Sequence, residues 1–581
     1  MIPIGEGTIS RILAKAEKQI ARYPVVSFDV FDTLLARDCT EPADVFDLVE
    51  KKYNETGHYS PLSGFREMRR NAEKACAEKY FAPTLEQIYE FLPVGKDEIE
   101  LLRSLEVDCE RSVSTVKYTG YRLYGIAKEQ SKRIIAVSDM YLGEAVIQDM
   151  LARAGYEVDA VVVSCDYHAE KYNGKLFHVA MEEMAVSGKD MSHFGDNPVA
   201  DWLGARRAGV ASMWIPARAH LAYFKRCGDP FCDRVLYPFV ANRTAIQEEK
   251  TQALGYETCG PMLIGFCQWL HEKLHDGGYQ KALFCARDMK QTRDVYLQMY
   301  PEDKDIASYF YASRKSLTLP YLAATGEDRS EEAAQQLELL LAYLEQLGCS
   351  GKVALIDSGL NGRSQKMLYE IIRDRFELHG MYIRVSNVFS RNVQDKETAV
   401  FMYPDKPEIK HMISSMFFET MLAAVHGRTV RYEKMPDGSI SPVMGSGHPE
   451  PTLIEQFQRG AGMFASDYLR SGLKTNPIPA AAVQDVMLRL AFFPQKQDVE
   501  LLEDLKCGNQ KYEHLLIHRE RGHYWIHPMD VFRDLKDTYW KGGLLRNCFS
   551  WMSPLAASVY LWADCMILEH IGEWKNPKEP E

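Results

Sequence analysis

Four apolar runs in the first 215 residues are each followed by side chains that can do chemistry. The first run leads into Asp29 and Thr33, the second ends at Ser138, and the region after the third carries Lys171. The fourth leads into the segment 195–201, which holds two aspartates. A carboxylate nucleophile, a hydroxyl, an ammonium group and an acidic pair together suit an oxyanion and a divalent cation. These residue types predict phosphoryl transfer.

The elements that must position these side chains alternate between strand-like and helical patterns. The strand-like runs are 24–29, 133–137, 160–163, 191–194 and 211–215. Such alternation predicts a parallel, doubly wound α/β sheet, whose carboxyl-end rim is where ligands bind. A helical insertion interrupts the alternation after the first strand.

The order of these residues resembles the four motifs of the haloacid dehalogenase (HAD) superfamily. The resemblance rests on Asp29-x-x-x-Thr33, Ser138, Lys171 with Phe177 six places later, and the Gly195-Asp196 to Asp201 segment. It covers about residues 20–220, and the insertion matches the position of the family's helical cap. The resemblance therefore implies a Rossmannoid core over 1–37 and 134–225, with a cap over 38–133.

The resemblance also implies a role for each matching position. Asp29 would attack phosphorus and form an aspartyl-phosphate, Ser138 would bind a phosphate oxygen, Lys171 would neutralise charge, and Thr33 would seat the loop. A magnesium ion would be held by the carboxylates of Asp29 and Asp196 and the backbone carbonyl of Phe31, with Asp201 either as a further ligand or as a support for the others. Asp139 and Asn197 are the expected substrate-binding neighbours.

Phe31 departs from the pattern of the family's phosphatases. They usually have an aspartate at this position, which acts as general acid and base and contributes about 10²- to 10⁴-fold in rate. Asp32 lies one place further, where the family usually has glycine, and we do not assign it that role. An aromatic residue here resembles the metal-free dehalogenase branch, but the Asp196 and Asp201 pair suits a cation. Three outcomes stay open: phosphoryl chemistry with a good leaving group, an acid from the cap, or a weakened, ligand-binding module.

Two stretches also resemble large HAD-like proteins associated with bacterial surface-polysaccharide biosynthesis. They are 28–35, with the sequence FDVFDTLL, and 138–142, with the sequence SDMYL. This resemblance implies a phosphorylated sugar or a glycan precursor as the substrate.

The second half of the chain predicts another α/β unit. Strand-like and helical runs alternate over 226–413, which we expect to be a Rossmann-like domain, and 414–581 is expected to be a mainly helical region packed on it. The turn after the strand-like run 353–356 opens a helix and faintly resembles the phosphate loop of phosphoribosyltransferases. The expected anion site comprises Arg287, Asp288, Arg314, Asp357, Ser358, Gly359, Asn361, Gly362, Arg363 and Ser364. A transferase activity located here is therefore an alternative function.

Composition limits the other classes of function. The 581 residues include 69 basic and 81 acidic side chains, a net charge of −12, which argues against broad nucleic-acid binding. Thirteen cysteines without a CxxC pair are typical of reduced thiols, so we expect a cytoplasmic protein. The apolar stretch 554–568 is short and contains Asp564, which predicts a packed helix instead of a membrane span.

Overall fold

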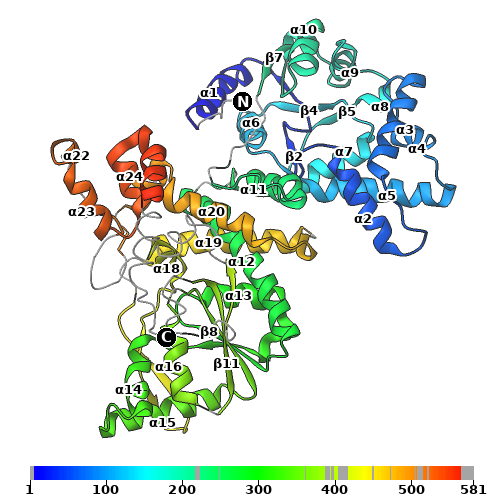
Figure 1. Cartoon of the computed structure of the whole chain (residues 1–581). Helices are drawn as coiled ribbons and strands as arrows, with labels where there is room; N and C mark the ends of the chain where they lie inside the picture. Colours follow the sequence, from blue (N-terminus) through cyan, green and yellow to red (C-terminus); the bar gives the residue numbers. More distant parts are fainter. Residues whose placement is uncertain are drawn as a thin grey trace. The chain divides into compact units, whose positions relative to one another are not determined.

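The chain forms two compact units (Figure 1). Unit 1 comprises Met1–Leu221 and Arg226–Gln247, and unit 2 comprises Ala222–Lys225 and Glu248–Glu581. The computed structural model describes residues 6–215, 221, 223–245, 247, 249–359, 361–373, 375–385, 393, 398–402, 416–447, 451–471, 473–503, 505–506, 515–517, 519 and 522–563. The predicted boundary at 413–414 and the stretch after 563 lie outside these residues.

Unit 1 is built on a five-stranded parallel sheet. Its strands lie in the order β5 (Ala160–Val163), β4 (Arg133–Ser138), β1 (Val25–Phe28), β6 (Met191–Gly195) and β7 (Ala211–Trp214). The first strand of the chain is therefore central, with later strands added on both sides. This order confirms the predicted doubly wound α/β class and places the end of β1 in the middle of the ligand-binding rim.

The sheet is buried on both faces, and its strands alternate between them. Val26 and Phe28 pack in one apolar cluster with α1 (Glu6–Ile20), α6 (Tyr118–Glu129) and α7 (Glu144–Arg153). Val25 packs in a second cluster with α9 (Lys175–Glu183) and α10 (Gly204–Arg207). The strands therefore lie between two helical layers, which fix the loops at their ends.

A helical insertion follows β1. It contains α2 (Asp44–Thr56), α3 (Phe65–Lys79), α4 (Leu85–Tyr89) and α5 (Lys96–Val113). An antiparallel ribbon of β2 (Leu35–Arg37) and β3 (Ser114–Val116) joins it to the sheet. Helix α6 lies within the range predicted as cap, but it packs on α1 and β4 as part of the sheet's helical layer.

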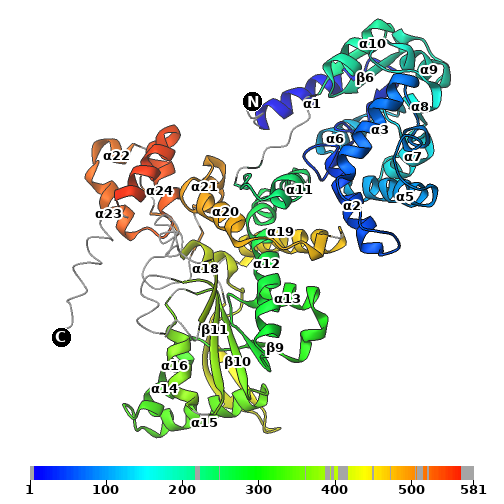
Figure 2. The ribbon, with the colours of Figure 1, turned by 45° about the vertical axis from the view of Figure 1, so that its right-hand side comes forward.

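Unit 2 contains a second five-stranded parallel sheet (Figure 2). Its order is β9 (Ala307–Phe310), β8 (Lys281–Cys285), β10 (Lys352–Asp357), β11 (Glu377–Arg384) and β12 (Thr398–Met402). Successive strands are added first on one side of β8 and then on the other, so the topology switches between β8 and β10. In open α/β sheets such a switch point leaves a crevice at the carboxyl ends of the strands.

Unit 2 contains many helices besides this sheet. They include α12 (Lys250–Asp276), α13 (Lys290–Met299), α14 (Arg314–Thr325), α15 (Glu331–Gln346), α16 (Arg363–Ile372), α18 (Met416–Leu422), α19 (Pro451–Arg470), α20 (Ala480–Phe492), α21 (Lys496–Leu502), α22 (His523–Ile526), α23 (Met529–Asp537) and α24 (Lys541–Phe549). The region predicted as mainly helical also contains a hairpin, β13 (Thr429–Lys434) with β14 (Ile440–Met444).

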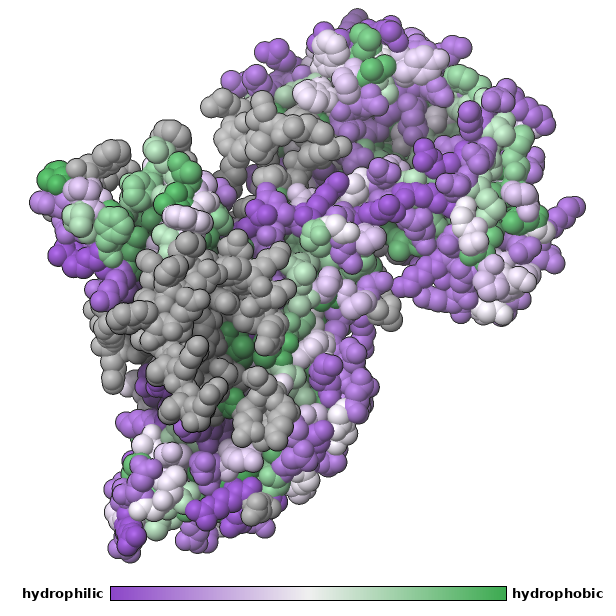
Figure 3. Space-filling model, viewed as in Figure 1, coloured by the Kyte–Doolittle hydropathy of each residue, from purple (hydrophilic) through white to green (hydrophobic). Residues whose placement is uncertain are grey.

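The last described helix, 553–563, is only partly packed. Ala557 and Leu561 are buried, whereas Leu555, Val559 and Trp562 are exposed. Figure 3 shows apolar side chains at the surface of the C-terminal helices. The stretch predicted as a packed helix is therefore helical as far as it is described, with one apolar face exposed. Among the described residues, no helix has both the length and the apolarity needed to cross a membrane.

Candidate functional site

The candidate nucleophile extends the central strand of unit 1. The backbone N–H of Asp29 donates to the carbonyl of Phe194 at 2.9 Å, so the β1–β6 ladder continues to this residue. The chain then turns tightly: Leu34 N donates to Val30 O at 2.9 Å, and Asp32 has a φ of 58°. Aspartate tolerates this left-handed conformation better than most residues, which explains how it stands where the resemblance expects glycine.

Lys171 joins two of the predicted carboxylates. Its Nζ lies 2.5 Å from Asp29 Oδ1 and 2.6 Å from Asp201 Oδ1, and only 3% of the side chain is exposed. The backbone N–H of Lys171 donates to the carboxylate of Asp139 at 3.0 Å, which fixes the lysine loop to the end of β4. Three segments far apart in the sequence therefore meet at one ammonium group.

Asp201 is held from several sides. Its Oδ2 accepts a hydrogen bond from Asn197 N at 2.8 Å, and His193 Nε2 lies 3.4 Å from its Oδ1. The side chain of Asn197 caps the following π-helix, Pro198–Leu203. A Cβ on Gly195 would lie 2.3 Å from Asp201 Cγ, so only glycine leaves room for the carboxylate here.

Asp29, Asp196 and Asp201 each offer a carboxylate oxygen, and the three oxygens lie within 4.8 Å of one another. Burial raises the pKa of Asp196 to about 6, with the neighbouring charges of Asp32 and Asp201 acting in the same direction. Burial also raises the pKa of Asp29 against the opposing effect of Lys171. Burial opposes ionisation of Asp201 as well, but Lys171 and His193 lower its pKa.

These carboxylates fit a magnesium ion. Hard carboxylate oxygens are its preferred protein ligands. Crowded like charges raise the pKa values of carboxylates, and a divalent cation relieves that repulsion. The residues present therefore suit the cation that the resemblance implies.

Ser138 and Thr33 lie beside this cluster without a hydrogen bond to it among the described residues. Ser138 is buried at the carboxyl end of β4, the strand next to β1. The hydroxyl of Thr33 is buried and has no partner in the part of the chain that the structure describes. The structure thus brings together Asp29, Lys171, Asp196, Asp201 and Asp139, with Asn197 at the same rim.

Phe31 occupies the position where the family's phosphatases usually have a general acid, and its ring is packed against Arg37. The guanidinium carbon of Arg37 lies 3.8 Å from the centre of the Phe31 ring. Arg37 Nε in turn forms a 3.0 Å ion pair with Glu110 of α5, and both side chains are largely buried. Phe31 is therefore anchored to the insertion.

His193 and Lys117 are contributors that sequence reasoning missed. His193 is fully buried between Ser27 Oγ, at 2.8 Å from its Nδ1, and Asp201. Lys117 lowers the pKa of Asp196 by its positive charge. His193 lies inside a strand and Lys117 follows β3, so neither carries a motif signal in the sequence.

Unit 2 contains a second candidate site, a cavity of about 380 Å³ at the topological switch point. It lies at the carboxyl ends of β8, β9 and β10. The predicted residues that line it are Arg287, Asp288, Arg314, Asp357, Gly359, Asn361, Gly362, Arg363 and Ser364. Ser358 is not in the lining; it is buried and donates to Asp288 Oδ2 at 2.8 Å. Lys315, Glu419 and Arg428 line the cavity as well.

The lining of the cavity holds more basic than acidic side chains, five against the three carboxylates of Asp288, Asp357 and Glu419. Among the described residues, none of its five basic side chains forms an ion pair with a carboxylate within 4.0 Å; they are Arg287, Arg314, Lys315, Arg363 and Arg428. Burial and the charge of Glu419 raise the pKa of Asp357 to about 7, and the pKa of Asp288 is raised for the same reasons.

Comparisons with known proteins point to one group of solved structures. No sequence-family model matches this chain, and neither does any curated protein. Similar solved structures include a 2-haloacid dehalogenase from Pseudomonas syringae pv. Tomato DC3000, a HAD hydrolase from Bacillus subtilis bound to magnesium and a HAD phosphatase from Thermococcus onnurineus. The dehalogenase is 17% identical over 33% of this chain and 86% of its own, with a TM-score of 0.26. The Bacillus subtilis protein is 18% identical over 33% of this chain and 89% of its own, with a TM-score of 0.24. The phosphatase is 17% identical over 35% of this chain and 87% of its own, with a TM-score of 0.24. The likeness is thus to HAD-like hydrolases over a third of the chain.

Proposed function

We propose that unit 1 is a magnesium-dependent phosphohydrolase or phosphotransferase that acts on a phosphorylated small molecule through Asp29. The observation that carries this proposal is the buried contact of Lys171 with Asp29 and Asp201, beside the carboxylate of Asp196. A carboxylate nucleophile held next to a fixed ammonium group and a cation site is the arrangement that phosphoryl transfer needs. A sugar phosphate or another glycan precursor is the substrate class that the sequence resemblance suggests.

In the proposed reaction, the Asp29 carboxylate attacks phosphorus and the bond from phosphorus to the leaving oxygen breaks. Among the described residues only Oδ1 of Asp29 is hydrogen-bonded, so Oδ2 is the oxygen available for attack. Water or an acceptor hydroxyl then displaces Asp29 and releases the phosphoryl group. Lys171 holds the nucleophile in place and offsets negative charge on the transferring group.

The magnesium ion would be held by Asp29, Asp196 and Asp201, with the backbone carbonyl of Phe31 as a further oxygen. When bound, it would neutralise charge on the phosphoryl oxygens. His193 and Asn197 act as positioning residues because both contact Asp201.

The packed ring of Phe31 decides which substrates suit this site. A leaving alkoxide requires a proton, and Phe31 cannot supply one. The leaving groups of aryl and acyl phosphates depart without that proton. We therefore propose that the enzyme turns over such phosphates faster than a sugar phosphate, whose leaving group is an alkoxide.

The test is turnover of aryl and acyl phosphates by the full chain with magnesium. We expect Asp29→Asn to lose at least a thousandfold in kcat/KM, because the amide is a poor nucleophile. Asp97→Asn is the matched control, since Asp97 is an exposed carboxylate in the first turn of α5 and is not part of the proposed site. Full activity in Asp29→Asn would remove Asp29 from the mechanism. No turnover by the wild type, together with saturable binding of a phosphate mimic, would favour a ligand-binding module.

We propose a second function for the cavity of unit 2, which is to bind a phosphorylated or nucleotide-linked ligand, as a transferase domain would. The excess of basic over acidic side chains in the lining supports it, as do two helix N-termini at the cavity, those of α14 and α16. Its volume suits a small phosphorylated molecule. Arg287 has a φ of 32°, and such strained backbone is concentrated at ligand sites. Asp357, with its pKa near neutrality, suits the role of general base.

Calorimetric titration with inorganic pyrophosphate tests this binding site. Arg363→Gln should weaken binding about tenfold, because a charge-assisted hydrogen bond to an anion is lost. Lys366→Gln is the matched control, since Lys366 is an exposed cation one turn further along α16 and outside the cavity lining. Equal affinity in both variants, or no binding to the wild type, would contradict the proposal.

A further inference from the structure

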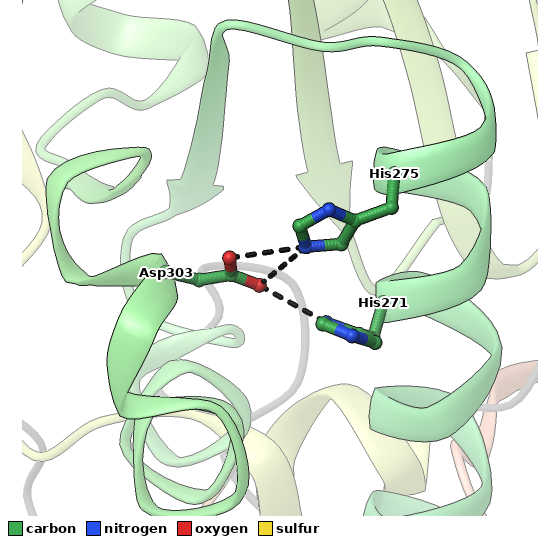
Figure 4. Close-up of side chains that lie close together, drawn as sticks. All are labelled: His271, His275 and Asp303. Carbon is green, nitrogen blue, oxygen red and sulfur yellow. Dashed lines mark hydrogen bonds and ion pairs between the residues drawn. The ribbon is translucent and has the colours of Figure 1, made fainter.

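Two histidines and an aspartate that belong to neither site described above converge in unit 2 (Figure 4). His271 and His275 are four residues apart on α12, so their rings lie on one face of the helix. Asp303 belongs to the short 3₁₀-helix η4 (Pro301–Asp305), which connects α13 to β9. Figure 4 shows both rings directed at the Asp303 carboxylate.

The distances join donor atoms of three side chains. His271 Nδ1 lies 3.0 Å from Asp303 Oδ2, and His275 Nε2 lies 3.1 Å and 3.2 Å from the two carboxylate oxygens. One ligand atom from each residue lies within 4.8 Å of those from the other two. Two imidazole nitrogens and one carboxylate oxygen form a donor set typical of zinc, whose preferred geometry is tetrahedral.

Neighbouring tyrosines hold these ligands in place. Tyr296 Oη donates a hydrogen bond to Asp303 Oδ2. The ring of Tyr300 stacks on that of His271, with centroids 3.7 Å apart and an interplanar angle of 2°. Partners of this kind orient metal ligands and are part of a metal site. Asp303 and His271 are thus held in position by the tyrosines that contact them.

The group of His271, His275 and Asp303 is also accessible to solvent. The side chain of Asp303 is only 5% exposed, but that of His275 is 52% exposed. A cation and a water ligand can therefore reach the group from the surface. Without a cation, each imidazole presents an N–H to Asp303; with one, each would present a lone pair and carry its proton on the other ring nitrogen.

We propose that His271, His275 and Asp303 bind a divalent transition-metal cation of the zinc class, with a fourth position open to water. The bound ion ties α12 to the connection between α13 and β9. It stabilises unit 2 because a ligand that binds only the folded state raises its free energy of unfolding.

Cobalt(II) is the probe that tests this proposal in the full chain. After treatment with a chelator, and with excess magnesium to fill the carboxylate site of unit 1, we expect one equivalent of cobalt to give a visible absorption band of four-coordinate cobalt. Zinc should abolish that band by displacement, and zinc should raise the melting temperature of the wild type.

Variants of the proposed ligands test whether the cobalt ion binds at this group. His275→Gln and Asp303→Asn should lose the band and the zinc-dependent thermal shift. His275 is half exposed, so its variant should keep the metal-free melting temperature. His527→Gln is the matched control, because His523 and His527 also lie four residues apart beside an aspartate, Asp530, but their donor atoms do not form such a three-residue group. Absence of the band in the wild type, or its persistence in His275→Gln, would overturn the proposal.

Discussion

At the candidate nucleophile, one ammonium group faces three carboxylates. With Asp29, Asp196 and Asp201 all ionised, Lys171 leaves these side chains with a net charge of −2, and the carboxylate of Asp139 beside Lys171 adds a further negative charge. A divalent cation would offset most of this charge. Burial raises the pKa of Asp196, and the charges of Asp32 and Asp201 act in the same direction, so a nearby cation would favour its ionised form. The charge count and the donor chemistry therefore favour the same cation.

In the proposed mechanism Phe31 leaves the leaving group without a general acid, so we expect Phe31→Asp to supply one. The variant places a carboxyl group two residues after Asp29, next to the leaving oxygen in the proposed reaction. We expect kcat for an alkyl phosphate to rise about 10- to 100-fold, with a smaller rise for an aryl phosphate, because only the alkoxide needs the proton. Steady-state kinetics on the two substrates measure the difference.

Phe31→Asn controls for the loss of the aromatic ring, since asparagine has the same shape as aspartate without a transferable proton. The ring of Phe31 packs on Arg37, so both variants lose the same contact. Equal rates for the two variants on the alkyl phosphate would show that position 31 supplies no proton.

Glu257 gives unit 2 a pH dependence that can be measured. Its side chain is buried in α12, and its Oε1 accepts hydrogen bonds from the backbone N–H groups of Tyr223 and Phe224. Burial raises its pKa from 4.5 to about 7. Between these values the folded protein holds a proton that the unfolded chain has released, so the free energy of unfolding falls as the pH rises.

Glu257→Gln should remove this dependence while it keeps both hydrogen bonds. Between pH 5 and 8 we expect its free energy of unfolding to rise relative to the wild type by about 2–3 kcal/mol. Urea unfolding across this pH range measures both proteins. If the free energies of unfolding of the wild type and of Glu257→Gln changed with pH in the same way, Glu257 would stay ionised in the folded state.

At the scale of elements, α12 and α19 approach each other through glycines. A Cβ on Gly460 would lie 1.9 Å from Gln252 O, and a Cβ on Gly255 would lie 1.9 Å from Phe457 O. We expect Gly460→Ala to force the helices apart and to lower the free energy of unfolding by about 1–3 kcal/mol. Chemical denaturation monitored by circular dichroism is the measurement.

Gly462→Ala is the control on the same helix. A Cβ there meets only the end of the Gln291 side chain, at 3.8 Å. Because alanine favours helix more than glycine does, this variant should be neutral or more stable. The same loss in both variants would contradict the role of close packing at Gly460.

The sequence predicts elements well where burial is continuous. The strands of unit 1 are runs of buried apolar residues, and their carboxyl ends bring Asp29, Lys171 and Asp201 to one rim, as expected. The β13–β14 hairpin was not expected, although its Asp437-Gly438 pair lies between alternating residues and is typical of hairpin turns.

The sequence does not reveal side-chain contacts between segments that lie far apart along the chain. The Arg37 ring contact and the Glu110 ion pair depend on how the insertion folds over the nucleophile loop. His193 and Asp303 act through partners on other elements, and no local pattern marks either residue. Such placements depend on tertiary packing, which hydrophobic periodicity and motif spacing do not indicate.

For the whole molecule, the two units have separate sheets, and their proposed cation sites differ in chemistry. Unit 1 offers three carboxylates, which suit magnesium, whereas unit 2 offers two imidazoles and one carboxylate, which suit zinc. A cation that binds one folded unit stabilises only that unit if the two unfold separately.

We therefore predict two calorimetric unfolding transitions that respond to different cations. Magnesium should raise one transition temperature and zinc the other, and Asp29→Asn and His275→Gln should each suppress only one of these shifts. Gly460→Ala should lower the zinc-sensitive transition, because α12 carries both histidines and packs on α19. Differential scanning calorimetry of the full chain with each cation gives the answer. A single transition raised by both cations would show that the two units unfold as one cooperative body.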